Sequence, residues 1–341
     1  APAAGIRSAK LARIMRGSAS LLGWVSSLSD GWWVSMPFLE DLQQFGPRSR
    51  RVVSREEAWA YCARLTAEHY ENFSVVTWLT PRDLRPAFQS IYSFCRWSDD
   101  LGDETGDPAR ALELLAWWRA SLLAAVGGEP PSHPVLITLV EVMREYQIPL
   151  PPFLALISAF EQDQRVTDYQ TLEQLLEYCT RSANPVGHLV LYLARAYTPE
   201  NAELADQTCT GLQLANFWQD VARDLEIGRI YLPREDRERF GYTDEDLRGR
   251  RFTPAFRDLL AHEVQTARRL LAAGAPLAGR LPWPIALDVE LFNRGGQAIL
   301  DGIAARGYDV WSRRPTVSKL AKLSLLVRAA WTQWARRKDV A

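Results

Sequence analysis

Two acidic segments carry the residues whose types and spacing could do chemistry. The first reads FCRWSDDLGDET, residues 94–105, and follows an apolar stripe of helical periodicity that includes Cys95. Asp99 lies four residues after Cys95 and Asp103 four residues after Asp99, so both carboxylates continue the stripe that should face the core. Asp100 is one residue out of phase and should point elsewhere. The segment therefore predicts two inward-facing carboxylates on one helix.

The second acidic segment reads NFWQDVARDLEIGRIYLP and covers residues 216–233. Asn216, Asp220 and Asp224 recur at intervals of four, which places three oxygen-bearing side chains on one helical face about 6 Å apart. An isolated acidic run is more often a solvated helix end. Here both segments place aspartates four residues apart on a face that is otherwise apolar, which favours a binding site over a solvated surface.

The chemistry that these residue types support is the binding of a hard cation. Carboxylates gathered on buried faces repel one another and must protonate or find cations. Oxygen ligands without His or Cys select Mg²⁺, which usually completes its shell with water and substrate phosphate. We therefore expect a cavity between two helices where Mg²⁺ is held against a diphosphate by Asp99, Asp103, Asn216, Asp220 and Asp224.

Arginines should lie near such a site, because the guanidinium fork matches phosphate oxygens and stays charged. Arg96 precedes Asp99 by three residues, and Arg229 and Tyr231 follow the second segment where its helix should end. For either arginine alone a surface salt bridge is the commoner role. Beside the acidic pairs, a role toward the diphosphate becomes the better interpretation.

The elements that must position these residues are helices. From residue 54 onward the helical period recurs without alternating strand patterns, so the fold class is predicted to be all-α. Ser54 followed by Glu57 is a capping-box signature that starts a helix. Residues 230–252 read as a charged irregular stretch. We expect one helical domain over residues 54–337, with residues 1–50 as an extension outside the fold, and further helices over about 81–101, 107–126, 133–146, 149–164, 171–197, 203–228, 254–274, 283–305 and 315–337.

The composition narrows the function classes. The 341 residues carry a formal net charge of -1, so no global field attracts nucleic acid, and we expect no nucleic-acid partner. Four widely spaced cysteines predict buried thiols in a reduced compartment, and four histidines show no metal-binding spacing. No run of about 18 uncharged apolar residues predicts a membrane-spanning helix. These features predict a cytoplasmic protein, with peripheral contact at the inner face of the cell membrane left open.

The sequence resembles the squalene and phytoene synthases over about residues 60–330. IYSFCRWSDDLGDE is similar to the first aspartate-rich motif of that family, NFWQDVARDLEIGRIYLP to the second, and GYDVWSRRPTVSKLAKL to the carboxy-terminal signature. The resemblance implies an isoprenoid-synthase-type helical bundle around a deep apolar cavity. It also implies Mg²⁺ bound by the five oxygen-bearing residues named above, an isoprenoid diphosphate substrate, and a diphosphate faced by Arg96, Arg229 and Tyr231.

Three departures from the general family pattern resemble the bacterial hydroxysqualene synthases of hopanoid biosynthesis. Gln219 stands where most members have arginine, residues 69–73 read HYENF, and residues 182–187 read SANPVG. This resemblance implies conversion of presqualene diphosphate to hydroxysqualene by loss of diphosphate, carbocation rearrangement and capture of water. It further implies coupling to enzymes that make presqualene diphosphate and reduce hydroxysqualene.

The departing motifs, and the carbocation chemistry that the resemblance implies, together suggest the residues that contact the substrate. His69, Phe73, Tyr92, Asn184 and Gln219 are the candidates beside the two arginines and Tyr231. Four polar residues could place the captured water: Gln219, Asn184, Glu71 and Asn72. Gln219 could instead fill the space of the missing arginine on the diphosphate side. His69 could equally be a helix histidine with no part in the site.

Two alternatives to this activity stay open. Within the family, the chain could condense two farnesyl diphosphates to presqualene diphosphate, squalene or dehydrosqualene, or make phytoene. Outside it, a non-catalytic helical lipid-binding protein is the remote alternative, disfavoured because none of the five ligand positions is lost. The carboxy-terminal stretch either rests on an anionic membrane or forms a solvated basic face, and carries Arg313, Arg314, Lys319, Lys322, Arg328, Trp331, Trp334, Arg336, Arg337 and Lys338.

Overall fold

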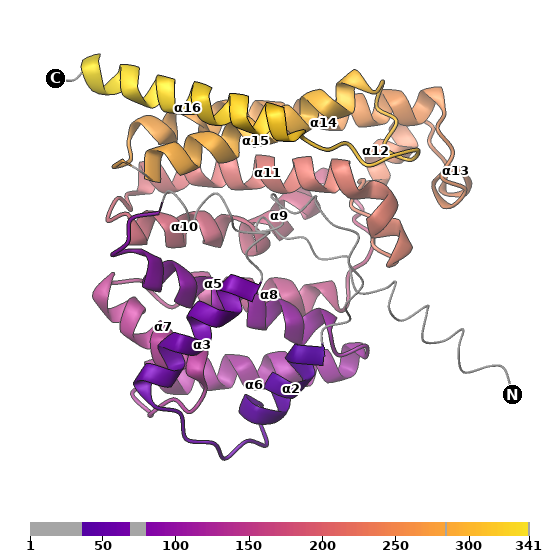
Figure 1. Cartoon of the computed structure of the whole chain (residues 1–341). Helices are drawn as coiled ribbons and strands as arrows, with labels where there is room; N and C mark the ends of the chain where they lie inside the picture. Colours follow the sequence, from indigo (N-terminus) through magenta and orange to yellow (C-terminus); the bar gives the residue numbers. More distant parts are fainter. Residues whose placement is uncertain (1–35, 69–79, 284, 340–341) are drawn as a thin grey trace, which may run out of the picture. The chain divides into compact units, whose positions relative to one another are not determined.

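The protein is helical wherever its structure is described, which confirms the predicted all-α class. The computed structural model (Figure 1) describes residues 36–68, 80–283 and 285–339, and within them no strand forms, only an isolated bridge between Asp168 and Ile230. The backbone contacts group into two compact units. Unit 1 takes residues up to 77 and residues 81–166, whereas unit 2 takes residues 78–80 and everything from residue 167 onward. Each unit is described by itself below.

Unit 1 is organised around the helix that carries the first acidic segment. Its helices are α2 (Met36–Phe45), α3 (Arg55–Glu68), α5 (Arg85–Asp103), α6 (Pro108–Val126), α7 (Pro134–Glu145) and α8 (Pro151–Asp163). Helix α5 packs against α3, α6, α7 and α8, and Phe94, Trp97 and Leu101 on α5 are fully buried. The predicted capping box is present, since Ser54 and Glu57 each accept a hydrogen bond from the backbone N–H of the other, at 3.1 and 3.0 Å.

The amino-terminal boundary of the fold lies earlier than the sequence analysis placed it. Residues 36–45, expected in an extension outside the fold, form α2 and pack into unit 1. Phe38 and Phe45 are buried, with the Phe38 ring 5.3 Å from Trp97, and the Tyr61 hydroxyl donates to Asp41 at 2.7 Å. Two buried phenylalanines anchor this short helix to the rest of unit 1. Residues 1–35 lie outside the described residues.

Unit 2 contains the second acidic segment on its longest helix. Its elements are α9 (Leu172–Ser182), α10 (Asn184–Leu193), α11 (Pro199–Glu226), α12 (Arg234–Arg239), α13 (Asp244–Arg248), α14 (Pro254–Gly274), the short helix η3 (Ala275–Gly279), α15 (Ile285–Ala305) and α16 (Lys319–Asp339). Helix α11 packs most extensively against α14. Glycine permits this close approach, because a Cβ atom at Gly274 would lie 2.1 Å from Thr208 Oγ1.

Two further differences from the predicted elements have local causes. The stretch over residues 230–252, predicted to be irregular, contains the short helices α12 and α13, and Thr243 caps α13 by accepting a hydrogen bond from Asp246 N at 3.1 Å. The last helix begins at Lys319 rather than near residue 315, since the residues before it turn back toward α11. All four cysteines are buried free thiols, as predicted.

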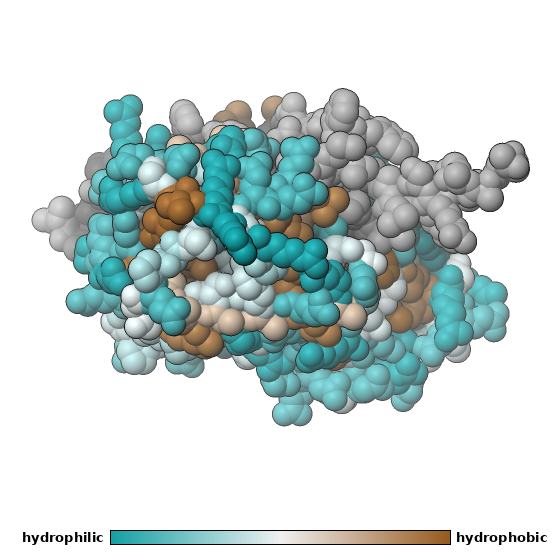
Figure 2. All heavy atoms as spheres, turned by 90° about the horizontal axis from the view of Figure 1, so that it is seen from below, coloured by the Kyte–Doolittle hydropathy of each residue, from teal (hydrophilic) through white to brown (hydrophobic). Residues whose placement is uncertain are grey.

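The surface outside the core is mixed in polarity. Figure 2 shows one face covered mostly by hydrophilic residues, with small separate apolar patches between them. No helix in the part of the chain that the structure describes is long and apolar enough to cross a membrane.

A buried carboxyl in α15 gives the fold a pH-dependent stability. Asp288 is buried, neither of its oxygens has a hydrogen-bond partner, and burial raises its pKa to about 8. In the unfolded chain this carboxyl ionises above about pH 4. Its contribution to stability is therefore complete below about pH 4 and is lost progressively as the pH rises toward 8.

We expect Asp288→Asn to remove this pH dependence. Between pH 5 and pH 8 the free energy of unfolding of the wild type should fall by on the order of 3 kcal/mol more than that of the variant. Urea unfolding of both proteins at several pH values measures the difference. Parallel stability curves would show that Asp288 is ionised in the folded protein.

Candidate active site

Helix α11 gathers the residues of the second acidic segment on one buried face. Asn216, Asp220 and Asp224 are all buried, and the amide Nδ2 of Asn216 donates to Asp220 Oδ2 at 3.2 Å. The interval of four residues therefore produces the shared face that the sequence predicted. The three side chains lie toward the carboxy-terminal end of α11, where the helix dipole disfavours negative charge. Such an arrangement requires cations.

The pKa of Asp224 reflects this requirement. Burial, reinforced by the charge of Asp220, raises the pKa of Asp224 well above its usual range, while Arg229, Arg314 and Arg223 oppose the rise. The carboxylate pair is thus poorly stabilised by solvent. A cation bound between the two groups would relieve both the desolvation and the mutual repulsion.

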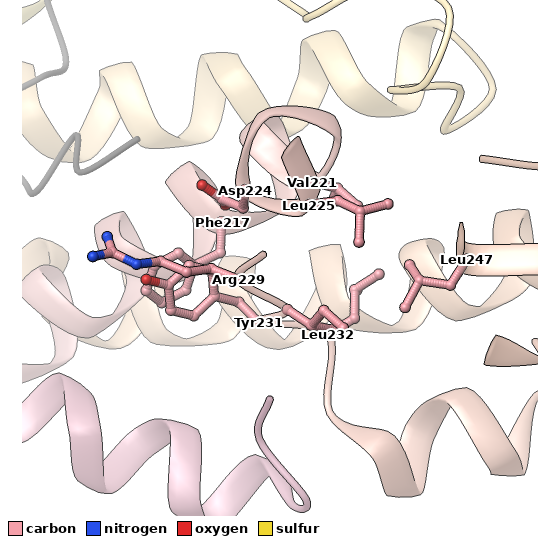
Figure 3. Close-up of a pocket in the computed structure, with 9 residues that line it drawn as sticks. Phe217, Val221, Asp224, Leu225, Arg229, Tyr231, Leu232 and Leu247 are labelled. Carbon is pink, nitrogen blue, oxygen red and sulfur yellow. The ribbon is translucent and has the colours of Figure 1, made fainter. Parts of the chain in front are cut away.

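A left-handed glycine turns the chain back after α11. Gly228 has φ +82°, and the backbone N–H of Arg229 donates to the Asp224 carbonyl at 2.8 Å, which ends the helix. The chain then places Tyr231 parallel to Phe217, with ring centroids 3.7 Å apart and planes 9° apart. Figure 3 shows Asp224, Arg229, Tyr231 and Phe217 around one pocket, whose other lining residues are aliphatic.

An arginine from the carboxy-terminal signature binds the second acidic segment, and sequence reasoning missed it. Arg314 Nε donates to Asp220 Oδ1 and its Nη2 donates to Oδ2 at 2.9 Å, a bidentate pair that is largely buried. In the sequence, Arg314 stood out only as one of the basic residues of the carboxy-terminal stretch. The signal that could have found it is the Arg-Arg-Pro within the GYDVWSRRPTVSKLAKL signature.

Gln219 forms hydrogen bonds that hold the segment carrying Arg314 in place. Its Oε1 accepts a hydrogen bond from Arg314 Nη2 at 3.0 Å, and its Nε2 donates to the Pro315 carbonyl at 2.5 Å. Both ends of the buried amide thus bind protein groups of unit 2. An arginine at this position would place a second guanidinium beside Arg314, so glutamine here is compatible with the Arg314–Asp220 pair.

The first acidic segment occupies the end of α5 in unit 1. Asp103 is the last residue of that helix, and Asp99 is largely buried one turn earlier. Arg96 binds Asp100 through two contacts, one from Nε to Oδ2 at 2.9 Å, while its Nη1 lies 3.9 Å from Asp99 Oδ2. Burial raises the pKa of Asp100 to about 7, and Arg96 opposes this rise.

The position of Asp100 corrects the sequence analysis. That residue was expected to point away from the buried face, but it is buried and is the principal partner of Arg96. Because α5 is packed against four helices, a residue one position away from the apolar stripe is still buried. Arg96 therefore lies between two aspartates rather than beside Asp99 alone.

The remaining predicted contacts are distributed over the two units. Tyr92 is buried on α5, one turn before Arg96. Asn184 is buried at the start of α10, and its Oδ1 accepts a hydrogen bond from Thr210 of α11 at 2.9 Å. His69 and Phe73 lie outside the described residues.

The donor set at the end of α11 fits a hard divalent cation. It consists of two carboxylates and one amide, all oxygen donors, as Mg²⁺ prefers. Within the described ranges, no three His, Cys, Asp or Glu side chains are grouped so as to hold a metal ion by themselves. A metal here would therefore complete its shell with water or substrate oxygens, and it would share Asp220 with Arg314.

Comparison with known proteins identifies the class. The family model for squalene/phytoene synthase matches residues 66–321, so the chain belongs to the squalene/phytoene synthase family. Members of this family are isoprenoid synthases that act on isoprenoid diphosphates with a divalent metal.

Among individual relatives, the crystal structure of squalene synthase HpnC from Alicyclobacillus acidocaldarius is 44% identical, with a TM-score of 0.71 over 74% of this chain and 95% of that one. The 15-cis-phytoene synthase of a Synechocystis species is 30% identical, covering 88% of this chain and 93% of its own. The phytoene synthase of Thermus thermophilus is 31% identical, covering 81% and 94% respectively.

Proposed function

We propose that this protein converts presqualene diphosphate and water to hydroxysqualene and diphosphate, with Mg²⁺. The observation that carries the proposal is the buried face of Asn216, Asp220 and Asp224, with Arg314 on Asp220 and Gln219 beside them. The 44% identity to squalene synthase HpnC over almost all of that chain supports a C30 product. Glutamine in place of arginine at position 219 supports a substrate with one diphosphate.

In this proposal the residues of both acidic segments are metal ligands. Asp99 and Asp103 of α5, together with Asn216, Asp220 and Asp224 of α11, would hold Mg²⁺. When bound, the metal supplies positive charge that stabilises the departing diphosphate. Arg229 and Arg314 add fixed positive charge from the protein, and guanidinium groups bind phosphate oxygens in a defined geometry.

The aromatic residues would protect the cation left after the C–O bond breaks. Phe217 and Tyr231 form a stacked pair in the pocket beside Asp224. Ring faces attract carbocations by about 0.5 to 2 kcal/mol each and exclude bulk water. One water then forms the new C–O bond at an allylic carbon and loses its proton, so the hydroxyl replaces the diphosphate and no reductant is consumed.

A second candidate is the condensation of two isoprenyl diphosphates. The identities of 30% and 31% to phytoene synthases, each over more than four fifths of this chain, favour it. Condensation requires binding of two diphosphates, whereas presqualene diphosphate carries one. The number of diphosphates that the site accepts therefore separates the two candidates.

The deciding experiment supplies each substrate separately. The full-length protein is incubated with Mg²⁺ and presqualene diphosphate, farnesyl diphosphate or geranylgeranyl diphosphate, and the extracted lipids are identified by mass spectrometry. Hydroxysqualene from presqualene diphosphate, with one oxygen from ¹⁸O-labelled water, is the expected result. A C40 product, or turnover of farnesyl diphosphate alone, would overturn the proposal in favour of condensation.

Gln219→Arg tests which role the glutamine has. We expect the new guanidinium to repel Arg314, and the hydrogen bond from Gln219 Nε2 to the Pro315 carbonyl is lost. Turnover should therefore fall by about 10-fold. If Gln219 only positions Arg314, the remaining product stays the alcohol. A shift from alcohol to hydrocarbon products would assign the placing of water to Gln219, and unchanged yield and product would exclude both roles. The matched control is Gln207→Arg, because Gln207 lies on the same helix outside the second acidic segment and is only half-buried. Gln213 is buried, so an arginine there would disturb the core.

A further inference from the structure

The outer face of α16 is apolar, although it is exposed. Five large apolar side chains on this helix are exposed: Leu320, Leu323, Val327, Trp331 and Trp334. Their spacings of three or four residues place them within an arc of about 80° on a helix that turns 100° per residue. They form one continuous line, which we call the α16 stripe.

The opposite face of α16 already has its packing partner. The helix packs against α15 within unit 2, as Figure 1 shows, with Ala329 and Gln333 buried and Arg294 donating to Thr332 at 3.0 Å. The α16 stripe is therefore not the packing face of this helix. Its most exposed members, Leu320 and Trp331, retain 81% and 67% exposure, which is unusual for a leucine and a tryptophan in a row of apolar side chains.

The charge around the stripe indicates what covers it. From Arg313 to Lys338 the chain carries eight cations and no acid, in a protein whose formal net charge is -1. Six of those cations lie within α16, three of them in its last turns. An apolar line with two tryptophans, on a helix whose sequence is rich in cations, matches the surface of an anionic bilayer, where each cation contributes attraction and each apolar side chain enters the acyl boundary.

We infer that α16 docks the protein on the surface of an anionic lipid bilayer through the α16 stripe. The helix lies on the membrane rather than crossing it, because no described helix is long and apolar enough to span. The Trp331 and Trp334 rings, with centroids 5.1 Å apart, provide a compact aromatic anchor at the interface. This inference does not depend on the proposed reaction, and vesicle binding is measured without turnover.

The test is vesicle flotation of the full-length protein and two matched variants. Leu323→Glu places a carboxylate in the stripe, and Leu123→Glu makes the same change on α6 at a leucine of similar exposure, 58% against 45%. Vesicles contain phosphatidylcholine alone or with about one third phosphatidylglycerol. The wild type should bind the anionic vesicles and dissociate as salt rises. Leu323→Glu should weaken that binding at least 10-fold, and Leu123→Glu should change it less than twofold.

Several results would overturn the inference. These are a wild type that stays in solution with both vesicles, equal binding to the two vesicle types, or equal loss of binding in both variants. A concentration-dependent dimer that Leu323→Glu dissociates would assign the stripe to a second copy of the chain instead. Circular dichroism and thermal unfolding of each variant exclude misfolding as the cause, because both leucines are exposed.

Discussion

Asp220→Asn and Asp224→Asn are each expected to lower kcat by about 10³-fold while leaving the protein folded. Both carboxylates are buried on one face of α11, and burial beside Asp220 raises the pKa of Asp224. In the proposed reaction they bring positive charge to the departing diphosphate, and loss of one preorganised electrostatic partner typically costs about 10² to 10³ in rate. Turnover of presqualene diphosphate at saturating Mg²⁺ measures the effect.

The control for these variants is Asp206→Asn on the same helix. Asp206 pairs with His188 at 2.8 Å and lies outside the second acidic segment, so its rate should stay within threefold of the wild type. In EDTA, Asp224→Asn should unfold at the same temperature as the wild type or higher, since the variant removes a carboxyl group whose ionisation is opposed by burial and by Asp220. Low activity accompanied by a lower unfolding temperature would instead assign Asp224 a structural role.

Arg314→Met is expected to strengthen metal binding and to lower activity. Arg314 holds both oxygens of Asp220, so in the metal-free protein it occupies a carboxylate that Mg²⁺ would also use. Removing this competitor should tighten Mn²⁺ binding, followed by electron paramagnetic resonance, by roughly fivefold to tenfold, about 1 kcal/mol. Turnover should fall by about 100-fold, because the guanidinium that would face the diphosphate is lost.

Arg313→Met is the matched control, since the neighbouring arginine is exposed. We expect its metal affinity and turnover to stay within twofold of the wild type. In EDTA, Arg314→Met should also unfold several degrees lower than Arg313→Met, because Asp220 and Asp224 lose a cation where no metal replaces it. Unchanged Mn²⁺ affinity in Arg314→Met would show that Arg314 and the metal do not share Asp220. Unchanged affinity in Asp220→Asn as well would remove Asp220 from the metal site.

The proposed metal ligands and the residues that hold them in place are different parts of the site. Asp220 and Asp224 belong to the proposed metal site, whereas Arg314 and Gln219 determine how that site is held before substrate arrives. The Gln219 amide fixes the segment that carries Arg314, because it binds Arg314 with one end and Pro315 with the other. A change at position 219 is therefore expected to act through Arg314 as well as through the substrate.

The long helices and the shared face of the second acidic segment follow from local sequence. The interval of four residues between Asn216, Asp220 and Asp224 fixes their common face through the geometry of the α-helix alone, and the structure confirms it. Ser54 and Glu57 likewise specify a helix start by local hydrogen bonds. The family followed from the same short motifs, since the residues that would handle diphosphate lie close together in the chain.

Packing between elements sets which distant residues meet those faces. Arg314 lies more than 90 residues after Asp220, and its side chain reaches the carboxylate because the chain turns back before α16. Asp100 is buried because helices pack around α5, which helical phase within one segment does not reveal. The stripe on α16 is exposed because another face of that helix packs on α15. Periodicity predicts that a helix has an apolar face, but packing between elements decides whether that face is covered.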